Sequence, residues 1–193
     1  MLKSTIEQLK PFVLPTRLDL TSPLNTYKYE ELLNEADRAI TELNKIKNKV
    51  VSVDLRIKTL ESFKDKYTKY KGDDSHTPLY LVYNDLVATR VISSNAYYML
   101  GIIPDYCTAS YYQLNGYRAV HVYYTEPNCF PIEIQMHTLH DHIINILLRK
   151  HIYKTDDEYY GEMLRNMYED GIITDETSFL MKLKELKEQH ALP

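Results

Sequence analysis

The sequence predicts an α+β domain in which a central mixed, mostly antiparallel sheet is flanked by helices. Helical periodicity occupies the first seventy residues, segments rich in β-branched residues occupy the middle, and helical periodicity returns after residue 138. The chain has 193 residues, of which 44% are hydrophobic and 26% are charged, so it is long enough to bury a sizeable core. We therefore expect residues 1–193 to form a single domain with helical extensions at both ends.

The N-terminal third of the chain is expected to be mostly helical. A short helix is predicted over Leu2–Leu9, and Pro11 is expected to end it. From about Tyr27 to Val50, apolar residues recur three or four apart, which predicts a long amphipathic helix. An extended piece is expected over Val51–Lys58, and it leads into a second helix from about Leu60 to Tyr70.

The middle of the chain has the composition of strands. Leu86–Ile92 is rich in β-branched residues, and Ala119–Tyr124 and Ile132–His137 are two further strand candidates. After Thr138 the pattern returns to helix, and a last helix is expected from about Asp175 to Gln189. The apolar residues that this last helix is expected to bury are Phe179, Leu183 and Leu186.

Several classes of protein are not expected from the composition. No run of about 18 apolar residues occurs, so no membrane span is expected. The segment Met1–Thr5 lacks the basic-then-apolar pattern of a secretion signal, and Cys107 and Cys129 are expected to be reduced thiols of a cytoplasmic protein. Neither GxGxxG nor GxxxxGK[ST] occurs, so a dinucleotide oxidoreductase and a P-loop NTPase are not expected.

The net charge of −4 conceals a basic segment. From Lys45 to Lys71 the chain carries nine basic residues and three acidic ones. A basic stretch within an acidic protein indicates a local site for phosphates. A solvated lysine face is the other explanation of the same pattern.

A row of polar side chains is expected on one face of the sheet. Successive side chains of a strand point to opposite faces, so Glu133, Gln135 and His137 lie opposite their apolar neighbours. The strand before it has the same construction, with Tyr117 and His121 on one face. Exposure of this face to solvent is the ordinary explanation of one such row, but two neighbouring rows favour a site.

Two carboxylates accompany these rows. Asp85 precedes the strand candidate Leu86–Ile92, and Glu133 belongs to the second polar row. Two carboxylates near each other can hold Mg²⁺, with water in the remaining coordination positions. Since Mg²⁺ commonly accompanies phosphate-bearing substrates, the carboxylates and the basic segment together predict phosphoryl chemistry.

Four segments follow one another along the chain, namely Arg56–Ser62, Asp85–Ile92, Asn115–His121 and Glu133–Thr138. In this order they resemble the synthetase domain of the RelA/SpoT family, over roughly residues 30–155. Members of the family transfer pyrophosphate from ATP to a nucleotide 3′-hydroxyl, on a mixed sheet flanked by helices that is related to nucleotidyltransferases. The resemblance implies a small, synthetase-only protein, because the chain has no room for the family's hydrolase domain.

The resemblance also implies a role for individual residues. Asp85 would hold Mg²⁺, and Glu133 would be either a second metal ligand or the base that takes the acceptor's 3′ proton. The basic residues that would bind ATP are Arg56, Lys58, Lys64 and Arg90. The residues that would bind the acceptor are Tyr117, which would stack on its base, and Arg118, His121, Gln135 and His137.

Two departures from the family pattern bear on the acceptor. In the family's EIQxRT motif the arginine is replaced by His137, which is mostly neutral at pH 7. In alarmone-making members a W-A-x-x-E-H helix commonly follows, but the corresponding stretch here is Ile144–Arg149, without tryptophan or glutamate. These departures make GDP or GTP a less expected acceptor.

A divergent branch of the family consists of toxins of toxin–antitoxin pairs, some of which pyrophosphorylate the 3′-CCA end of tRNA. We expect this chain to be such a toxin, with an antitoxin protein as partner. The lysines available to hold tRNA phosphates are Lys45, Lys47, Lys49, Lys69 and Lys71, together with Lys66, although ATP binding alone would also explain them. The alternative is a small alarmone synthetase that uses GDP, GTP or an adenine nucleotide. A catalytically inactive binding module is the third hypothesis, and the intact carboxylates argue against it.

Overall fold

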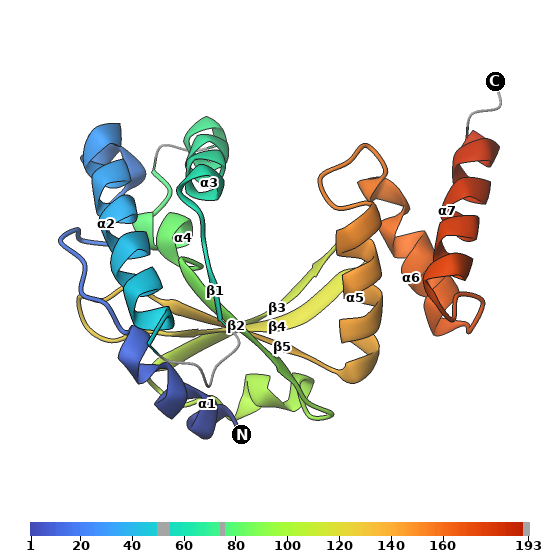
Figure 1. Ribbon diagram of the computed structural model, residues 1–193, viewed down its shortest axis with the longest axis horizontal. Coiled ribbons are helices and arrows are strands. Elements are labelled where there is room, and N and C mark those ends of the chain that lie inside the picture. Colours follow the sequence, from blue (N-terminus) through green and yellow to red (C-terminus); the bar gives the residue numbers. More distant parts are fainter. Residues whose placement is uncertain (50–54, 74–75, 191–193) are drawn as a thin grey trace. The chain divides into compact units, whose positions relative to one another are not determined.

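The computed structural model describes residues 1–49, 55–73 and 76–190, and it confirms the α+β class (Figure 1). Within the described residues, five strands form a mostly antiparallel sheet in the order β1-β2-β5-β4-β3. The strands are β1 (Leu55–Ile57), β2 (Val87–Ile92), β3 (Cys107–Leu114), β4 (Tyr117–Tyr124) and β5 (Ile132–His137). None of the helices in these ranges combines the length and the apolar character that crossing a membrane requires.

The described part of the chain contains seven α-helices. They are α1 (Leu2–Leu9), α2 (Tyr29–Lys47), α3 (Leu60–Asp73), α4 (Leu79–Tyr83), α5 (Leu139–His151), α6 (Gly161–Glu169) and α7 (Glu176–His190). The predicted helices are confirmed, with α3 continuing three residues beyond Tyr70. The predicted end of the long helix at Val50 and the start of the extended piece at residues 51–54 lie outside the described residues.

The chain divides into two compact units. Unit 1 consists of Met1–Val91, Ile103–Ala109 and His121–Gln135, and unit 2 consists of Ile92–Ile102, Ser110–Val120 and the chain from Met136 onward. Strands β2 to β5 each contribute residues to both units. That the two units act as the single domain expected from the sequence stays a prediction.

The core of unit 1 is built on the amphipathic face of α2 and on a group of aromatic rings. Leu32 and Ala36 on α2 are fully buried, as the helical spacing predicts. The ring of Tyr83 lies 4.9 Å from that of Phe63 and 5.4 Å from that of Phe130. Its hydroxyl donates to the carbonyl of Leu32 at 2.7 Å, so its polar atom is satisfied inside the core.

The core of unit 2 lies among α5, α6 and α7, which Figure 1 shows in orange to red. Its members include Ile144 on α5 and Leu164 on α6, both fully buried. Helix α5 begins where the hydroxyl of Thr138 accepts from the backbone N–H of Asp141, an N-cap of the ordinary kind. The residues that α7 buries are the three expected ones, Phe179, Leu183 and Leu186.

Three elements were not predicted, namely β3, α4 and α6. Strand β3 shows no alternation of buried and exposed residues, because nearly all of its side chains after Cys107 are exposed or half-buried. Helix α4 has five residues, which is too short for a helical period to be recognised. Helix α6 has only nine residues and buries Arg165 beside Leu164, which disguises its apolar face.

The turn between β3 and β4 packs directly against the start of α6 within unit 2. Asn115 and Gly116 both have positive φ angles, 49° and 81°, as a two-residue hairpin turn requires. A Cβ atom on Gly116 would lie 2.2 Å from the carbonyl oxygen of Gly161, and one on Gly161 would lie 1.9 Å from that of Asn115. The two backbones therefore approach each other with no room for a side chain at either glycine.

We predict that Gly161→Ala lowers the free energy of unfolding by about 1–3 kcal/mol, because the added methyl group forces the turn and α6 apart. Urea unfolding followed by circular dichroism measures this effect. Gly101→Ala is the matched control in unit 2, since a Cβ atom there meets nothing within 4 Å. Equal stability of the two variants would contradict the close approach.

Candidate active site

Asp85 lies at the start of β2 in unit 1 and accepts contacts from three cations. Lys58 Nζ lies 2.7 Å from its Oδ2, Lys66 Nζ lies 2.8 Å from its Oδ1, and Arg56 Nη2 lies 3.4 Å from Oδ2. Strand β1 pairs antiparallel with β2 and sets Arg56 opposite Ala88. This register brings Arg56 and Lys58 to the start of β2, while Lys66 arrives from α3.

The ionisation of Asp85 follows from this surrounding. Burial alone would raise the pKa of its carboxyl group, but attraction to Lys66 and Lys58 outweighs burial and lowers the pKa to about 2. Burial lowers the pKa of Lys66 itself, more than the charge of Asp85 raises it. Asp85 is therefore a carboxylate at neutral pH, which is the form that binds a metal ion.

Glu133 on β5 is the second carboxylate of unit 1 and is only 4% exposed. His121 Nδ1 lies 2.9 Å from its Oε1, and Gln135 Nε2 donates to its Oε2 at 2.8 Å. Arg56 Nη2 lies 3.8 Å from the same Oε2. Burial, and then the charge of Glu133, raises the pKa of Tyr123. The polar row is therefore not a solvent-wetted face, and the ordinary explanation of it is wrong.

The residues of this cluster fit a divalent cation bound together with phosphate. Mg²⁺ typically takes one or two carboxylates and fills its other positions with water and phosphate oxygens. Asp85 and Glu133 supply two carboxylates, and no group of three or more His, Cys, Asp or Glu placed to hold a metal occurs in the ranges that the structure describes. The three cations outnumber the two carboxylates, so the cluster favours a polyphosphate.

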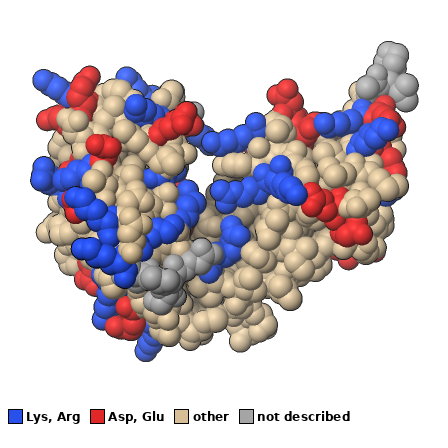
Figure 2. Space-filling view, in the orientation of Figure 1, with Lys and Arg blue, Asp and Glu red and all other residues tan. Residues whose placement is uncertain are grey.

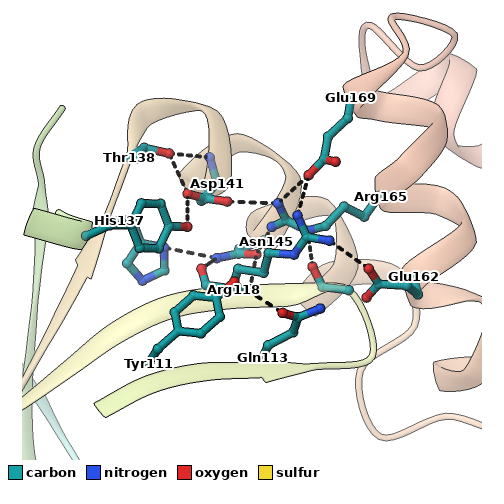
Figure 3. A network of polar contacts seen from close by, with 12 residues as sticks. Tyr111, Gln113, Arg118, His137, Thr138, Asp141, Asn145, Glu162, Arg165 and Glu169 are labelled. Carbon is teal, nitrogen blue, oxygen red and sulfur yellow. Dashed lines mark hydrogen bonds and ion pairs between the residues drawn. The ribbon is translucent and has the colours of Figure 1, made fainter. Parts of the chain in front are cut away.

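Of the residues expected to bind the acceptor, unit 2 holds Tyr117, Arg118 and His137. Tyr117 Oη lies 3.5 Å from His137 Nε2, and the two rings meet edge to face at 5.8 Å. The guanidinium of Arg118 instead pairs with two carboxylates of α6, Glu162 at 2.7 Å and Glu169 at 2.8 Å (Figure 3). These ion pairs occupy the guanidinium, and a contact between Arg118 and the acceptor stays a prediction.

A lysine that was not among the residues expected to bind ATP lies beside Asp85. It is Lys66, which was expected only among the lysines that hold tRNA phosphates, whereas Lys64 is exposed on α3. A signal was available, because Lys66 is three residues after the buried Phe63 and next to the buried Tyr67, so the helical period turns it towards the core. Arg90 on β2 is half-buried, and its Nε has no hydrogen-bond partner within the described residues.

The lysines expected to hold tRNA fall into two groups. Lys45 pairs with Glu42 at 2.7 Å, and the ammonium of Lys47 donates to the carbonyl of Leu55, so these two already have partners. Apart from Lys66, all five are exposed, and for Lys49, Lys69 and Lys71 no ion pair is found among the described residues. Figure 2 shows basic side chains on the visible face of unit 1, with acidic ones between them.

No family model matches the sequence, and no protein of curated function matches it either. Among solved structures, the small alarmone synthetase 1 from Bacillus subtilis bound to its product pppGpp is 18% identical, with 85% of this chain and 98% of that chain covered and a TM-score of 0.43. A GTP pyrophosphokinase family protein from Streptococcus pneumoniae is 19% identical, with coverages of 84% and 93% and a TM-score of 0.41. The Bacillus subtilis protein bound to AMPCPP is 19% identical, with coverages of 84% and 97% and a TM-score of 0.36.

These are proteins of the kind that the four sequence segments resemble, and none of the three concerns tRNA or a toxin–antitoxin pair. At such identities and TM-scores the similarity carries no argument about activity. The function has to be inferred from the side chains of this chain.

We predict that Asp85→Asn destabilises the protein at pH 7, and that its deficit shrinks as the pH falls below about 4. With a folded-state pKa of about 2 against an ordinary value of 3.8, ionised Asp85 contributes roughly 2 kcal/mol that is present above pH 4 and lost as the pH falls through 2. Urea unfolding from pH 7 to pH 3 measures this dependence. The control Asp65→Asn, at an exposed position on α3, should show the same stability and the same pH dependence of stability as the wild-type protein. The same pH dependence in Asp85→Asn and wild type would contradict the ion-pair cluster.

Proposed function

We propose that the chain is an ATP-dependent pyrophosphotransferase that moves pyrophosphate from ATP to the 3′-hydroxyl of a nucleotide acceptor. The observation that carries this proposal is the position of Arg56, whose Nη2 lies 3.4 Å from a carboxylate oxygen of Asp85 and 3.8 Å from one of Glu133. Lys58 and Lys66 add two more cations to the same cluster. Phosphoryl transfer needs this combination, because carboxylates hold the divalent ion and cations hold phosphate oxygens.

The cations of the cluster are proposed to bind the polyphosphate of ATP. Arg56 presents a planar fork of donors that suits phosphate oxygens, and Lys58 and Lys66 act as compact charges. On binding, the two lysines exchange the oxygens of Asp85 for those of phosphate, which frees Asp85 for the metal. Lys64 and Arg90 stay proposed contacts to ATP.

The proposed transfer forms a bond between the acceptor's 3′-oxygen and the β-phosphorus of ATP. The bond from that phosphorus to the bridging oxygen of AMP breaks, and AMP leaves. Glu133 takes the proton of the 3′-hydroxyl, or else serves as second metal ligand while that proton passes to water. Contacts from His121 and Gln135 fix the two oxygens of Glu133 in place. Mg²⁺, when held by Asp85, neutralises the charge that develops on the phosphate oxygens.

The acceptor is proposed to stack its base on Tyr117, a contact worth ~1–3 kcal/mol in nucleic-acid sites. GDP and GTP are the first pair of candidate acceptors, those of the small alarmone synthetase that the sequence gives as the alternative. The 3′-CCA end of tRNA, favoured from the sequence, is the second candidate. The exposed lysines Lys49, Lys69 and Lys71 support it. An enzyme of that kind would stop translation and would need a neutralising partner protein.

We predict that Glu133→Gln lowers pyrophosphate transfer about 100-fold or more, because it removes the proposed base or metal ligand. Incubation with γ-labelled ATP and GDP, GTP, ATP or bulk tRNA measures transfer to each acceptor. Asp85→Asn should show a similar loss at a temperature where circular dichroism finds it folded. Glu30→Gln, an exposed position on α2, is the matched control and should transfer at the wild-type rate. Near-wild-type transfer by Glu133→Gln would contradict its role, and no transfer by the wild-type protein would favour an inactive binding module.

Variants of the exposed lysines distinguish tRNA from GDP or GTP as the acceptor. If tRNA is used, replacing Lys49, Lys69 and Lys71 by glutamate should weaken tRNA use and flatten its salt dependence by roughly one unit for each phosphate that a lysine no longer neutralises. Use of GDP or GTP should hardly change. The control replaces three exposed lysines elsewhere, namely Lys3, Lys154 and Lys184. Unchanged transfer to tRNA, at an unchanged salt slope, would contradict a role for these lysines.

A further inference from the structure

Asn145, a buried residue of α5, has an amide whose orientation is fixed by its neighbours in unit 2 (Figure 3). Its Oδ1 accepts from Arg165 Nη2 at 2.9 Å and from the backbone N–H of Arg118 at 3.3 Å. Both of these groups are donors only, so the oxygen of the amide has to face them. The Nδ2 of Asn145 therefore points the other way, where it donates to the carbonyl of Arg118 at 2.8 Å and lies 3.0 Å from His137 Nδ1.

This orientation decides the protonation of His137, which is 1% exposed. Because the amide Nδ2 carries only donors, His137 Nδ1 has to be the acceptor of this hydrogen bond. The imidazole is then neutral and carries its proton on Nε2. His137 Nε2 lies 3.5 Å from Tyr117 Oη, so the ring N–H is directed at the tyrosine hydroxyl.

The orientation of Asn145 depends on Arg165, which is itself held in place by its neighbours. Its side chain is fully buried, and its Nη1 pairs with Asp141 at 2.8 Å and with Glu169 at 3.2 Å. Its Nε donates to the carbonyl of Gly116. Asp141 is itself held by the hydroxyls of Thr138 and Tyr97, so neither partner of this ion pair is free to turn.

We propose that Arg165, Asn145 and His137 are positioning residues for Tyr117, the ring on which the acceptor base stacks. Arg165 fixes the amide of Asn145, the amide fixes the tautomer of His137, and the imidazole N–H orients Tyr117. The inference rests on the proposed function, since it takes Tyr117 to be the contact to the acceptor. It gives His137 a role that arginine cannot fill, because arginine has no acceptor to offer Asn145.

Asn145→Asp is the test, because it keeps the shape and the acceptor for Arg165 but replaces the donor that faces His137 by an oxygen. We expect the KM for the acceptor that the wild-type protein uses to rise about fivefold or more, with kcat and the KM for ATP little changed. Tyr117→Phe should raise the same KM, and the double variant Asn145→Asp/Tyr117→Phe should be no worse than the worse single variant. Additive effects, or an unchanged KM in Asn145→Asp, would overturn the proposal.

A second measurement does not depend on activity. Long-range ¹H–¹⁵N correlation spectra of the full chain report the tautomer of each histidine, and Asn145→Asp identifies the signals of His137. The proton is expected on Nε2 in the wild-type protein and on Nδ1, or on both nitrogens, in Asn145→Asp. A wild-type His137 protonated on Nδ1 would overturn the proposal. A wild-type protein without transfer to any acceptor would overturn the proposed function instead, and the tautomer would still decide the arrangement behind Tyr117.

Discussion

A carboxylate stays ionised away from water only when cations and donors replace its hydration, and Asp85 is where unit 1 meets this requirement. Lys58 and Lys66 supply most of the compensation, and Arg56 adds a longer contact. Since these cations come from β1, from the residue after it and from α3, their convergence ties three parts of unit 1 to the start of β2. The proposed catalytic charges are therefore part of what holds this unit together.

Unit 2 follows the same rule with the signs reversed. Here the buried charge is the guanidinium of Arg165, and the carboxylates of Asp141 and Glu169 compensate it. Its remaining donors go to the carbonyl of Gly116 and the amide of Asn145, so the ion pair becomes the origin of a directed set of hydrogen bonds. Unit 1 thus holds a buried anion among cations, and unit 2 holds a buried cation among anions. In the proposed enzyme the first would supply the chemistry and the second the orientation.

The sequence could predict what depends on neighbours along the chain, and it failed where the deciding neighbour is distant. Strand β5 has the predicted bounds, because alternation alone defines it. For Arg118, in contrast, only the position of α6 reveals the two carboxylates that its guanidinium contacts. The contact of Lys66 with Asp85 was accessible in principle from the helical period, but nine basic residues in one segment concealed it. The role of Asn145 could not be predicted, since it depends on an arginine twenty residues further along the chain.

The ion pairs around Asp85 have a consequence for the order in which substrates can bind. Its Oδ1 already accepts from Lys66 and its Oδ2 from Lys58, so a metal ion arriving alone competes with two ammonium groups for the same oxygens. Phosphate oxygens offer the lysines another partner, and the carboxylate becomes accessible when they move to it. If this is the ATP site, a free metal ion finds the carboxylate occupied by lysines, and a free nucleotide leaves the carboxylate without a metal ion. The nucleotide–metal complex is therefore the species that the cluster would bind. The protein would then discriminate against free divalent cations without any side chain dedicated to excluding them.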